Sequence, residues 1–121
     1  MDVQIRREEL QKMYDGCTDS MVEVMDAFLD SEKDVLSELS VAFENENENL
    51  IRQQLHYHAP VFGYVGFSQV TLFLKDMENK YKNPTNKNEM KKDLQAVLQV
   101  IKQVTSLLVF EKELLKPVAH A

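Results

Sequence analysis

The spacing of the apolar residues limits the fold of this chain more than any other feature of its sequence. Apolar side chains recur every three or four positions through most of the 121 residues, which is the period of one face of an α-helix. Only three glycines and three prolines interrupt these stretches, and their content of Glu, Lys, Leu, Gln and Met favours helix over strand. The sequence therefore predicts an all-α protein.

Turn and capping signals divide this pattern into five helices. Ser20 with Glu23, and Asn86 with Glu89, have the spacing of a capping box, and Pro117 should end the last helix. We expect three apolar residues of the first helix to face the core, namely Ile5, Leu10 and Met13. The expected helices cover residues 4–14, 20–43, 47 through Phe62, 67–81 and 86–115.

Four of these helices are long, and the connections between them are short. Such a pattern predicts an antiparallel up-down-up-down four-helix bundle, with the short N-terminal helix packed across one end. A length of 121 residues gives room for one core, so residues 1–121 are expected to form a single domain. We expect a monomer, because every apolar stripe can be buried within that one bundle.

Charge and composition restrict the class of partner. The net charge of −6 argues against nucleic-acid binding, which needs a basic surface, and favours a protein partner. No apolar run is long enough to span a membrane, and the N-terminus does not have the pattern of a signal peptide. Cys17 is the only cysteine. These features together predict a cytoplasmic protein with no membrane association.

Two histidines lie close together on the third expected helix. His56 and His58 are two residues apart, which on a helix is a rotation of about 200°, so they cannot share a metal site and no metal is expected. His58 continues the apolar stripe, which predicts a core histidine with a buried hydrogen bond. His56 points away from that stripe, toward Arg52 and Gln53, and should be exposed.

The segment around these histidines resembles the histidine-containing phosphotransfer (HPt) domain of two-component phosphorelays. The phosphoacceptor position of that family falls on His56, its apolar position two residues later on His58, and the glycine ten residues later on Gly66. A helix with apolar residues then leads to Glu78, as in the family. The resemblance covers residues 8–82, while the last helix, 86–115, agrees only in kind.

The resemblance implies a function as a phosphocarrier. His56 would relay a phosphoryl group between the aspartates of response-regulator receiver domains, with a hybrid sensor kinase as a further partner. The receiver would supply the aspartate, a lysine and Mg²⁺, and this chain would need no cofactor of its own. The sequence contains no glycine-rich nucleotide loop, so we expect no autokinase activity.

Two departures from the family pattern lie beside the histidine. Ala59 stands where the family has a lysine, and Pro60 where it has a glycine. Both positions flank His56 on a helix, so Ala59 removes a positive charge that would help to neutralise the phosphoryl group. Pro60 cannot donate a hydrogen bond to the carbonyl of His56, and the helix is expected to kink or loosen there.

Other residues could complete the site or a docking surface. Arg52 could replace the lost charge, and Gln53 and Gln69 could donate hydrogen bonds to a phosphoryl group. Gly63 and Gly66 permit a tight connection to the next helix, and Tyr64 could contribute to an apolar docking patch.

Two other interpretations remain open. The chain could be a degenerate HPt-like module that binds a receiver domain without carrying phosphate, as the departures at Ala59 and Pro60 would allow. It could also be a helical adaptor in which the exposed histidine has no role.

Overall fold

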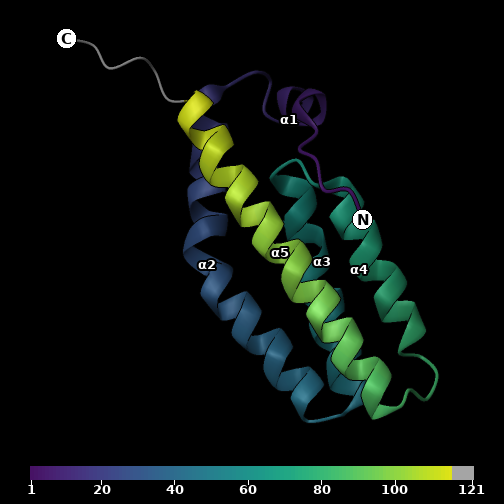
Figure 1. Cartoon of the computed structure of the whole chain (residues 1–121). Coiled ribbons are helices and arrows are strands. Elements are labelled where there is room, and N and C mark those ends of the chain that lie inside the picture. The colour runs from purple at the N-terminus through teal and green to yellow at the C-terminus, as the bar shows by residue number, and fades with distance from the viewer. Residues whose placement is uncertain (116–121) are drawn as a thin grey trace.

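Residues 1–115 form five helices. The computed structural model describes residues 1–115 and contains no strand within them, which confirms the predicted all-α class for that part of the chain. Figure 1 shows that these helices pack together into a helical bundle. The helices are α1 (Arg7–Met13), α2 (Thr18–Glu44), α3 (Glu48–Tyr64), α4 (Ser68–Lys80) and α5 (Lys87–Leu115).

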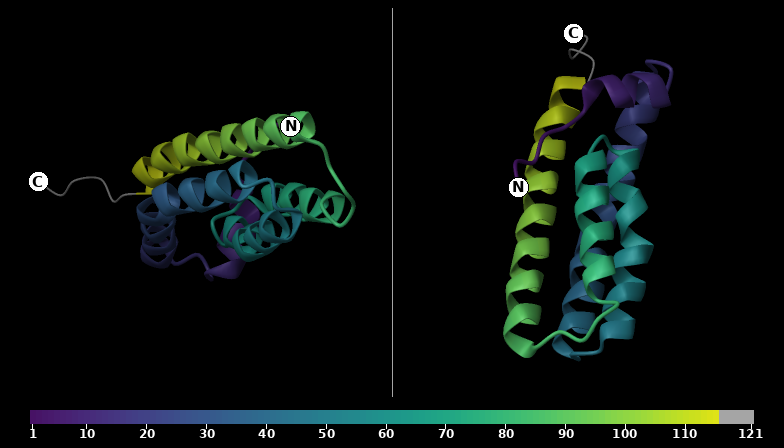
Figure 2. Two further views of the ribbon diagram at one scale, coloured as in Figure 1. Left: turned by 90° about the horizontal axis from the view of Figure 1, so that it is seen from below. Right: turned by 90° about the vertical axis from the view of Figure 1, so that its right-hand side faces the viewer.

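The long helices do not contact one another equally. Helix α3 packs against α2 on one side and against α4 on the other, whereas α5 packs mainly against α2 and touches α4 little. Helix α1 crosses the end of the bundle at which α2 begins and α5 ends (Figure 2). This arrangement leaves the outer face of α3, between α2 and α4, open to solvent.

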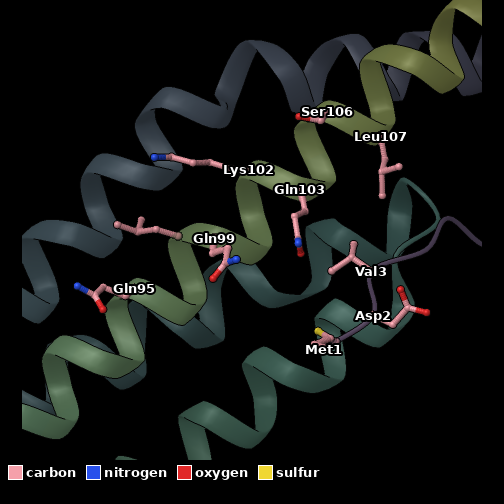
Figure 3. A pocket seen from close by; sticks show the side chains of 10 residues that line it. Met1, Asp2, Val3, Gln95, Gln99, Lys102, Gln103, Ser106 and Leu107 are labelled. Atoms are coloured by element: carbon pink, nitrogen blue, oxygen red, sulfur yellow. The ribbon is translucent and has the colours of Figure 1, made fainter.

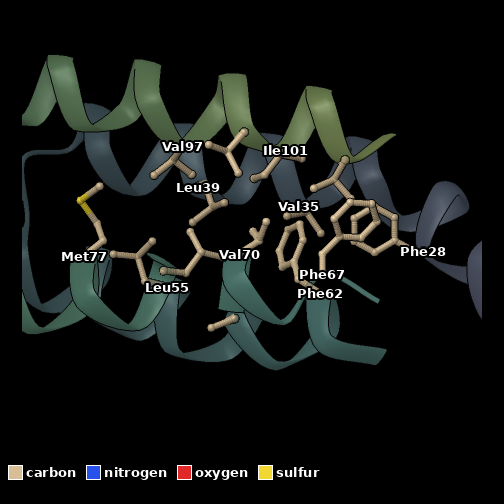
Figure 4. Close-up of a cluster of buried hydrophobic side chains, with 14 of the residues drawn as sticks. Phe28, Val35, Leu39, Leu55, Phe62, Phe67, Val70, Met77, Val97 and Ile101 are labelled. Atoms are coloured by element: carbon tan, nitrogen blue, oxygen red, sulfur yellow. The ribbon is translucent and has the colours of Figure 1, made fainter. Parts of the chain in front are cut away.

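The core runs along the inside of the four long helices. Each contributes side chains that are fully buried, among them Leu39 from α2, Leu55 from α3, Val70 from α4 and Ile101 from α5 (Figure 4). Burying a side chain of this size stabilises the fold by about 1.5–3 kcal/mol. This shared core makes α3 and α4 a rigid support for the side chains on their outer faces.

The helix ends agree with the capping signals only in part. Asn47 caps α3 by accepting a hydrogen bond from the Leu50 N–H at 3.1 Å. The expected capping box at Ser20 is wrong, because α2 begins after Cys17, which provides no side-chain cap. Met13, predicted to be a core residue, is 46 % exposed, because α1 buries only Leu10. The expected helix stop at Pro117 lies outside the described residues.

Only one of the two hydrogen bonds of the capping box expected at Asn86 and Glu89 forms. The Asn86 side chain accepts the Glu89 N–H at 2.9 Å. The Glu89 carboxylate, however, pairs with Lys80 at 2.9 Å instead of returning to the cap. Lys80 also contacts Asp93 of α5, and the Tyr81 hydroxyl donates to the same carboxylate at 2.6 Å. These contacts fix the end of α4 to the start of α5.

Helix α5 is long and rich in apolar residues. By length and composition alone it passes a test for a helix that could cross a membrane. The core helix of a soluble protein passes the same test. Val97, Ile101, Val104 and Leu108 of α5 lie in the core of the bundle.

Candidate functional site

The two histidines of α3 lie in opposite environments. The side chain of His56 is 80 % exposed, whereas that of His58 is 5 % exposed. The buried Nε2 of His58 lies 2.8 Å from a carboxylate oxygen of Glu38 on α2. The prediction of a core histidine with a hydrogen bond is confirmed. The exposed position expected for His56 is confirmed as well, so only one of the two rings is accessible to a partner.

A carboxylate from α4 holds the exposed ring. The Nδ1 of His56 lies 3.2 Å from Oε1 of Glu78, whose own side chain is 21 % exposed. A carboxylate accepts hydrogen bonds, so this contact favours the tautomer that carries its proton on Nδ1. The Nε2 of the neutral ring then has a free lone pair and faces solvent. The arrangement therefore presents one nitrogen of His56 as a nucleophile.

Two basic residues, Arg52 and Lys82, line the same depression as this ring. Arg52, Gln53, His56, Glu78 and Lys82 line an open depression of about 370 Å³ on the surface between α3 and α4. Arg52 is oriented by a hydrogen bond to Asn49, and Lys82, just past the end of α4, forms no ion pair with any residue in the range 1–115. The predicted neighbours Arg52 and Gln53 are thus brought together with His56.

Sequence reasoning missed Glu78 and Lys82 as site residues. Helices α3 and α4 form a hairpin with its turn at Gly66, so residues at similar distances from that turn lie opposite each other. Glu78 then faces His56, and Lys82 faces Arg52. Taking the two helices as a hairpin would have identified both residues.

The two departures from the family pattern take different positions. Ala59 is 1 % exposed, and its carbonyl accepts a hydrogen bond from the Thr71 hydroxyl at 2.6 Å. Its expected role beside the reactive ring or on a docking surface is wrong, because it packs between α3 and α4. Pro60 is exposed, and α3 continues through it to Tyr64.

The other predicted supporting residues lie toward the turn. Gly66 is buried with a φ of +92°, and a Cβ there would lie 2.9 Å from Leu10 of α1. Its carbonyl accepts the Arg6 N–H at 2.7 Å, and Gln69 donates to the Gln4 carbonyl at 2.7 Å. Gly66 and Gln69 therefore anchor the N-terminal segment and do not belong to the depression at His56. Gly63 faces Thr71 and lies outside it too.

An exposed apolar row follows the histidine along α3. Tyr57 is 71 % exposed and Tyr64 56 %, and Pro60 lies exposed between them. Spacings of three and four residues put the three side chains on one face of the helix. The expectation that Tyr64 reaches the surface is confirmed. An apolar surface beside the reactive ring suits contact with another protein.

A larger hollow lies elsewhere on the molecule. A depression of about 750 Å³ lies between the N-terminal residues Met1, Asp2 and Val3 and the outer side of α5, as Figure 3 shows. Its α5 lining is mainly amide, hydroxyl and aliphatic side chains, with one lysine. It offers no group with the nucleophilic character of an exposed imidazole.

Comparison with known proteins identified no relative of this chain. Searches among models of protein families, curated proteins and solved structures found no match to this chain.

Proposed function

We propose that the chain is a histidine phosphotransfer carrier, which relays a phosphoryl group between receiver-domain aspartates through His56. The observation that carries this proposal is the environment of the ring, with an 80 % exposed imidazole whose Nδ1 is held by Glu78 among the cations Arg52 and Lys82. The partners are response-regulator receiver domains and a hybrid sensor kinase. The carrier acts in the cytoplasm as a monomer without autokinase activity, and its cofactor requirement is met by Mg²⁺ on the receiver.

The transfer step requires little of the carrier beyond this geometry. The Nε2 lone pair attacks the phosphorus of an aspartyl phosphate, so an N–P bond forms while the acyl P–O bond breaks and the receiver carboxylate leaves. The ring becomes positively charged as the N–P bond forms, since Nδ1 keeps its proton. The Glu78 carboxylate stabilises that charge, much as a buried aspartate stabilises imidazolium in a catalytic triad.

The phosphoryl oxygens need positive charge around them. Phosphoryl transfer relies mainly on positioning and charge stabilisation. In the proposed carrier, Arg52 and Lys82 supply the charge that Ala59 cannot, from the α4 side of the histidine. Arg52 is half-buried and Lys82 is exposed, and both carry their charge on a long flexible stem, so they can adjust to the donor and the acceptor receiver in turn.

The proposed architecture is the one expected of such a carrier. We infer an antiparallel up-down-up-down four-helix bundle made by α2 to α5, with α1 across one end. Short connections between consecutive helices and the packing of α3 against both of its sequence neighbours support it. In this arrangement the proposed reactive ring lies near the middle of α3, on a helix that is packed against both α2 and α4.

A transfer assay tests the carrier. The chain is incubated with a phosphorylated receiver domain, and the product is examined for phosphate that is labile in acid and stable in alkali. We expect label on the natural sequence and on His58→Gln but none on His56→Gln, with circular dichroism verifying that each variant is folded. Label retained in His56→Gln would overturn the assignment.

A second function is favoured by a specific observation. The family lysine is replaced by Ala59, which is buried, and no cation stands on the first turn after His56. A receiver-binding module that carries no phosphate would tolerate this change. Receiver binding without transfer in the same assay would favour that module, and the lack of any receiver binding would favour a helical adaptor.

A further inference from the structure

A second hollow lies on the other side of α3 from the cations. It has a volume of about 260 Å³ and opens between α2 and α3. Its lining is almost wholly apolar or aromatic, with Val24, Ala27 and Phe28 from α2 and Val61, Tyr64 and Val65 from the end of α3. The hydroxyl of Tyr14, another lining residue, is engaged with the Tyr64 carbonyl at 2.6 Å.

This hollow continues the exposed row of α3. Tyr64 belongs both to its rim and to the row with Tyr57 and Pro60. The exposed row therefore leads along α3 from the neighbourhood of His56 to the rim of the hollow. A hollow of about 260 Å³ is large enough to accept one large aliphatic or aromatic side chain. The surface is therefore suited to bind a partner protein that inserts such a side chain into the hollow.

Carboxylates flank the hollow on the α2 side. Glu23, Asp34 and Glu38 share one helical face with the lining residues Ala27 and Ser31, at spacings of four, four, three and four residues. Glu23 and Asp34 are exposed, and neither forms an ion pair with a described residue.

The negative charge of these carboxylates is not offset by a basic residue on the same face of α2. Its one lysine, Lys33, is next to Asp34 in sequence and therefore lies about 100° away around the helix. The apolar surface thus has an acidic border along α2. The opposite border, between α3 and α4, is formed by the cations Arg52 and Lys82 beside His56.

We propose that the hollow between α2 and α3 receives a receiver-domain helix bearing one large apolar side chain flanked by lysine or arginine. This inference rests on the proposed carrier function and adds the chemistry of the partner's surface. Charge complementarity selects the occupant, because a helix with basic flanks is attracted to Glu23 and Asp34. The two borders have opposite charge, so they also fix the orientation in which the acidic phosphorylation site of the receiver meets Arg52 and Lys82.

The test uses a purified receiver domain that takes phosphate from His56 in the transfer assay. Its dissociation constant from the full chain is measured by fluorescence anisotropy at low and high salt. We expect Glu23→Lys/Asp34→Lys to weaken binding about tenfold at low salt, and the effect to shrink as salt screens the charges. Ala27→Leu, which fills the hollow at an exposed helical position, should weaken binding at both salt concentrations.

Matched controls separate this inference from the function on which it rests. Glu8→Lys/Asp76→Lys makes the same change of net charge at exposed positions on α1 and α4 and should leave the dissociation constant within twofold. His56→Gln removes transfer but keeps the α2–α3 surface, so it should bind as the natural sequence does. If transfer proceeds while Glu23→Lys/Asp34→Lys and Ala27→Leu bind normally, this inference is overturned and the carrier stands. If no receiver binds the natural sequence, both are overturned.

Discussion

At the scale of single residues, the pair formed by His56 and Glu78 determines which nitrogen is available for reaction. A free imidazole exchanges its proton between two nitrogens, whereas the contact of 3.2 Å to Glu78 favours the proton on Nδ1. The ring is 80 % exposed, so no packing contact would otherwise hold it in place. A single acceptor on α4 therefore sets both the tautomer and the direction of Nε2.

Removal of this acceptor should slow transfer without unfolding the chain. We expect Glu78→Ala to reduce the rate of phosphate transfer from a receiver by about 10-fold or more, the range typical for the loss of a group that orients a histidine. Glu78→Gln keeps an oxygen acceptor and should keep the tautomer, while it loses the charge that stabilises the imidazolium. Rapid-quench kinetics measure the rates, and ¹⁵N NMR of the ring reports the tautomer. Equal rates in all three proteins would contradict the orienting role.

In the proposed carrier, Lys82 supplies the positive charge that the HPt family places one turn after the histidine. We expect Lys82→Ala to slow transfer several-fold, because a phosphoryl group with close to two negative charges then has only Arg52 beside it. Lys82→Arg should retain most of the rate. Lys75→Ala, at an exposed lysine of α4 outside the lining of the depression, is the control. If Lys82→Ala and Lys75→Ala give the same rate, Lys82 has no special part in the site.

At the scale of elements, the connection between α3 and α4 depends on one glycine. Gly66 has a φ of +92°, and an added Cβ would lie 2.9 Å from two atoms of the Leu10 side chain. The close approach lets Leu10 of α1 become buried over the end of the α3–α4 hairpin. The backbone conformation and the packing of α1 therefore both require glycine at this position.

The two glycines of this connection should respond oppositely to alanine. We expect Gly66→Ala to lower the free energy of unfolding by about 1–3 kcal/mol, through positive-φ strain and overpacking. Gly63 lies within α3, and a Cβ there meets the Thr71 hydroxyl at an ordinary 3.5 Å. Gly63→Ala should therefore raise the free energy of unfolding by about 0.5–1 kcal/mol. Urea denaturation compares the two, and equal effects would refute this assignment.

Helical periodicity made most of the elements predictable, and pairing between helices made the site only partly so. Apolar spacing and the signal at Asn47 located α3 within a residue or two, and the period alone separated the exposed His56 from the buried His58. Ser20 misled because its hydroxyl contacts Cys17 at 3.2 Å instead of capping α2. Ala59 misled because the side of α3 that faces α4 cannot be known before the two helices are paired. The same pairing was needed to find Glu78 and Lys82.

At the scale of the whole molecule, the bundle is closed by a polar contact at the end opposite α1. The Tyr81 side chain is almost wholly buried, with the residue 1 % exposed, and its hydroxyl donates to Asp93 at 2.6 Å. Lys80 adds an ion pair to the same carboxylate at 2.8 Å. Helix α5 touches α4 little elsewhere, so these contacts hold the last helix beside the hairpin that carries the site.

This closure predicts a loss of stability in alkali. Burial, with the neighbouring Asp93 carboxylate, raises the pKa of Tyr81 far above that of a free phenol. The folded chain therefore keeps a proton that the unfolded chain releases near pH 10. The contribution of Tyr81 is complete below pH 10 and is lost as the pH rises beyond it. The free energy of unfolding should fall there by up to about 1.4 kcal/mol per pH unit for this one group.

Urea unfolding between pH 8 and pH 11.5 measures this slope. In Tyr81→Phe the alkaline decline should be shallower, leaving the parts due to other groups with a raised pKa, namely Lys80 through its hydrogen bonds to Asp93 and Glu89, Lys112 through its hydrogen bond to Asp26 and Tyr14 through burial. At neutral pH the same variant should lose about 1 kcal/mol, because Asp93 loses one donor but keeps Lys80. Tyr57→Phe, at a 71 % exposed tyrosine, should decline as steeply as the natural sequence. If Tyr81→Phe does so too, the closure between α4 and α5 does not depend on the buried phenol.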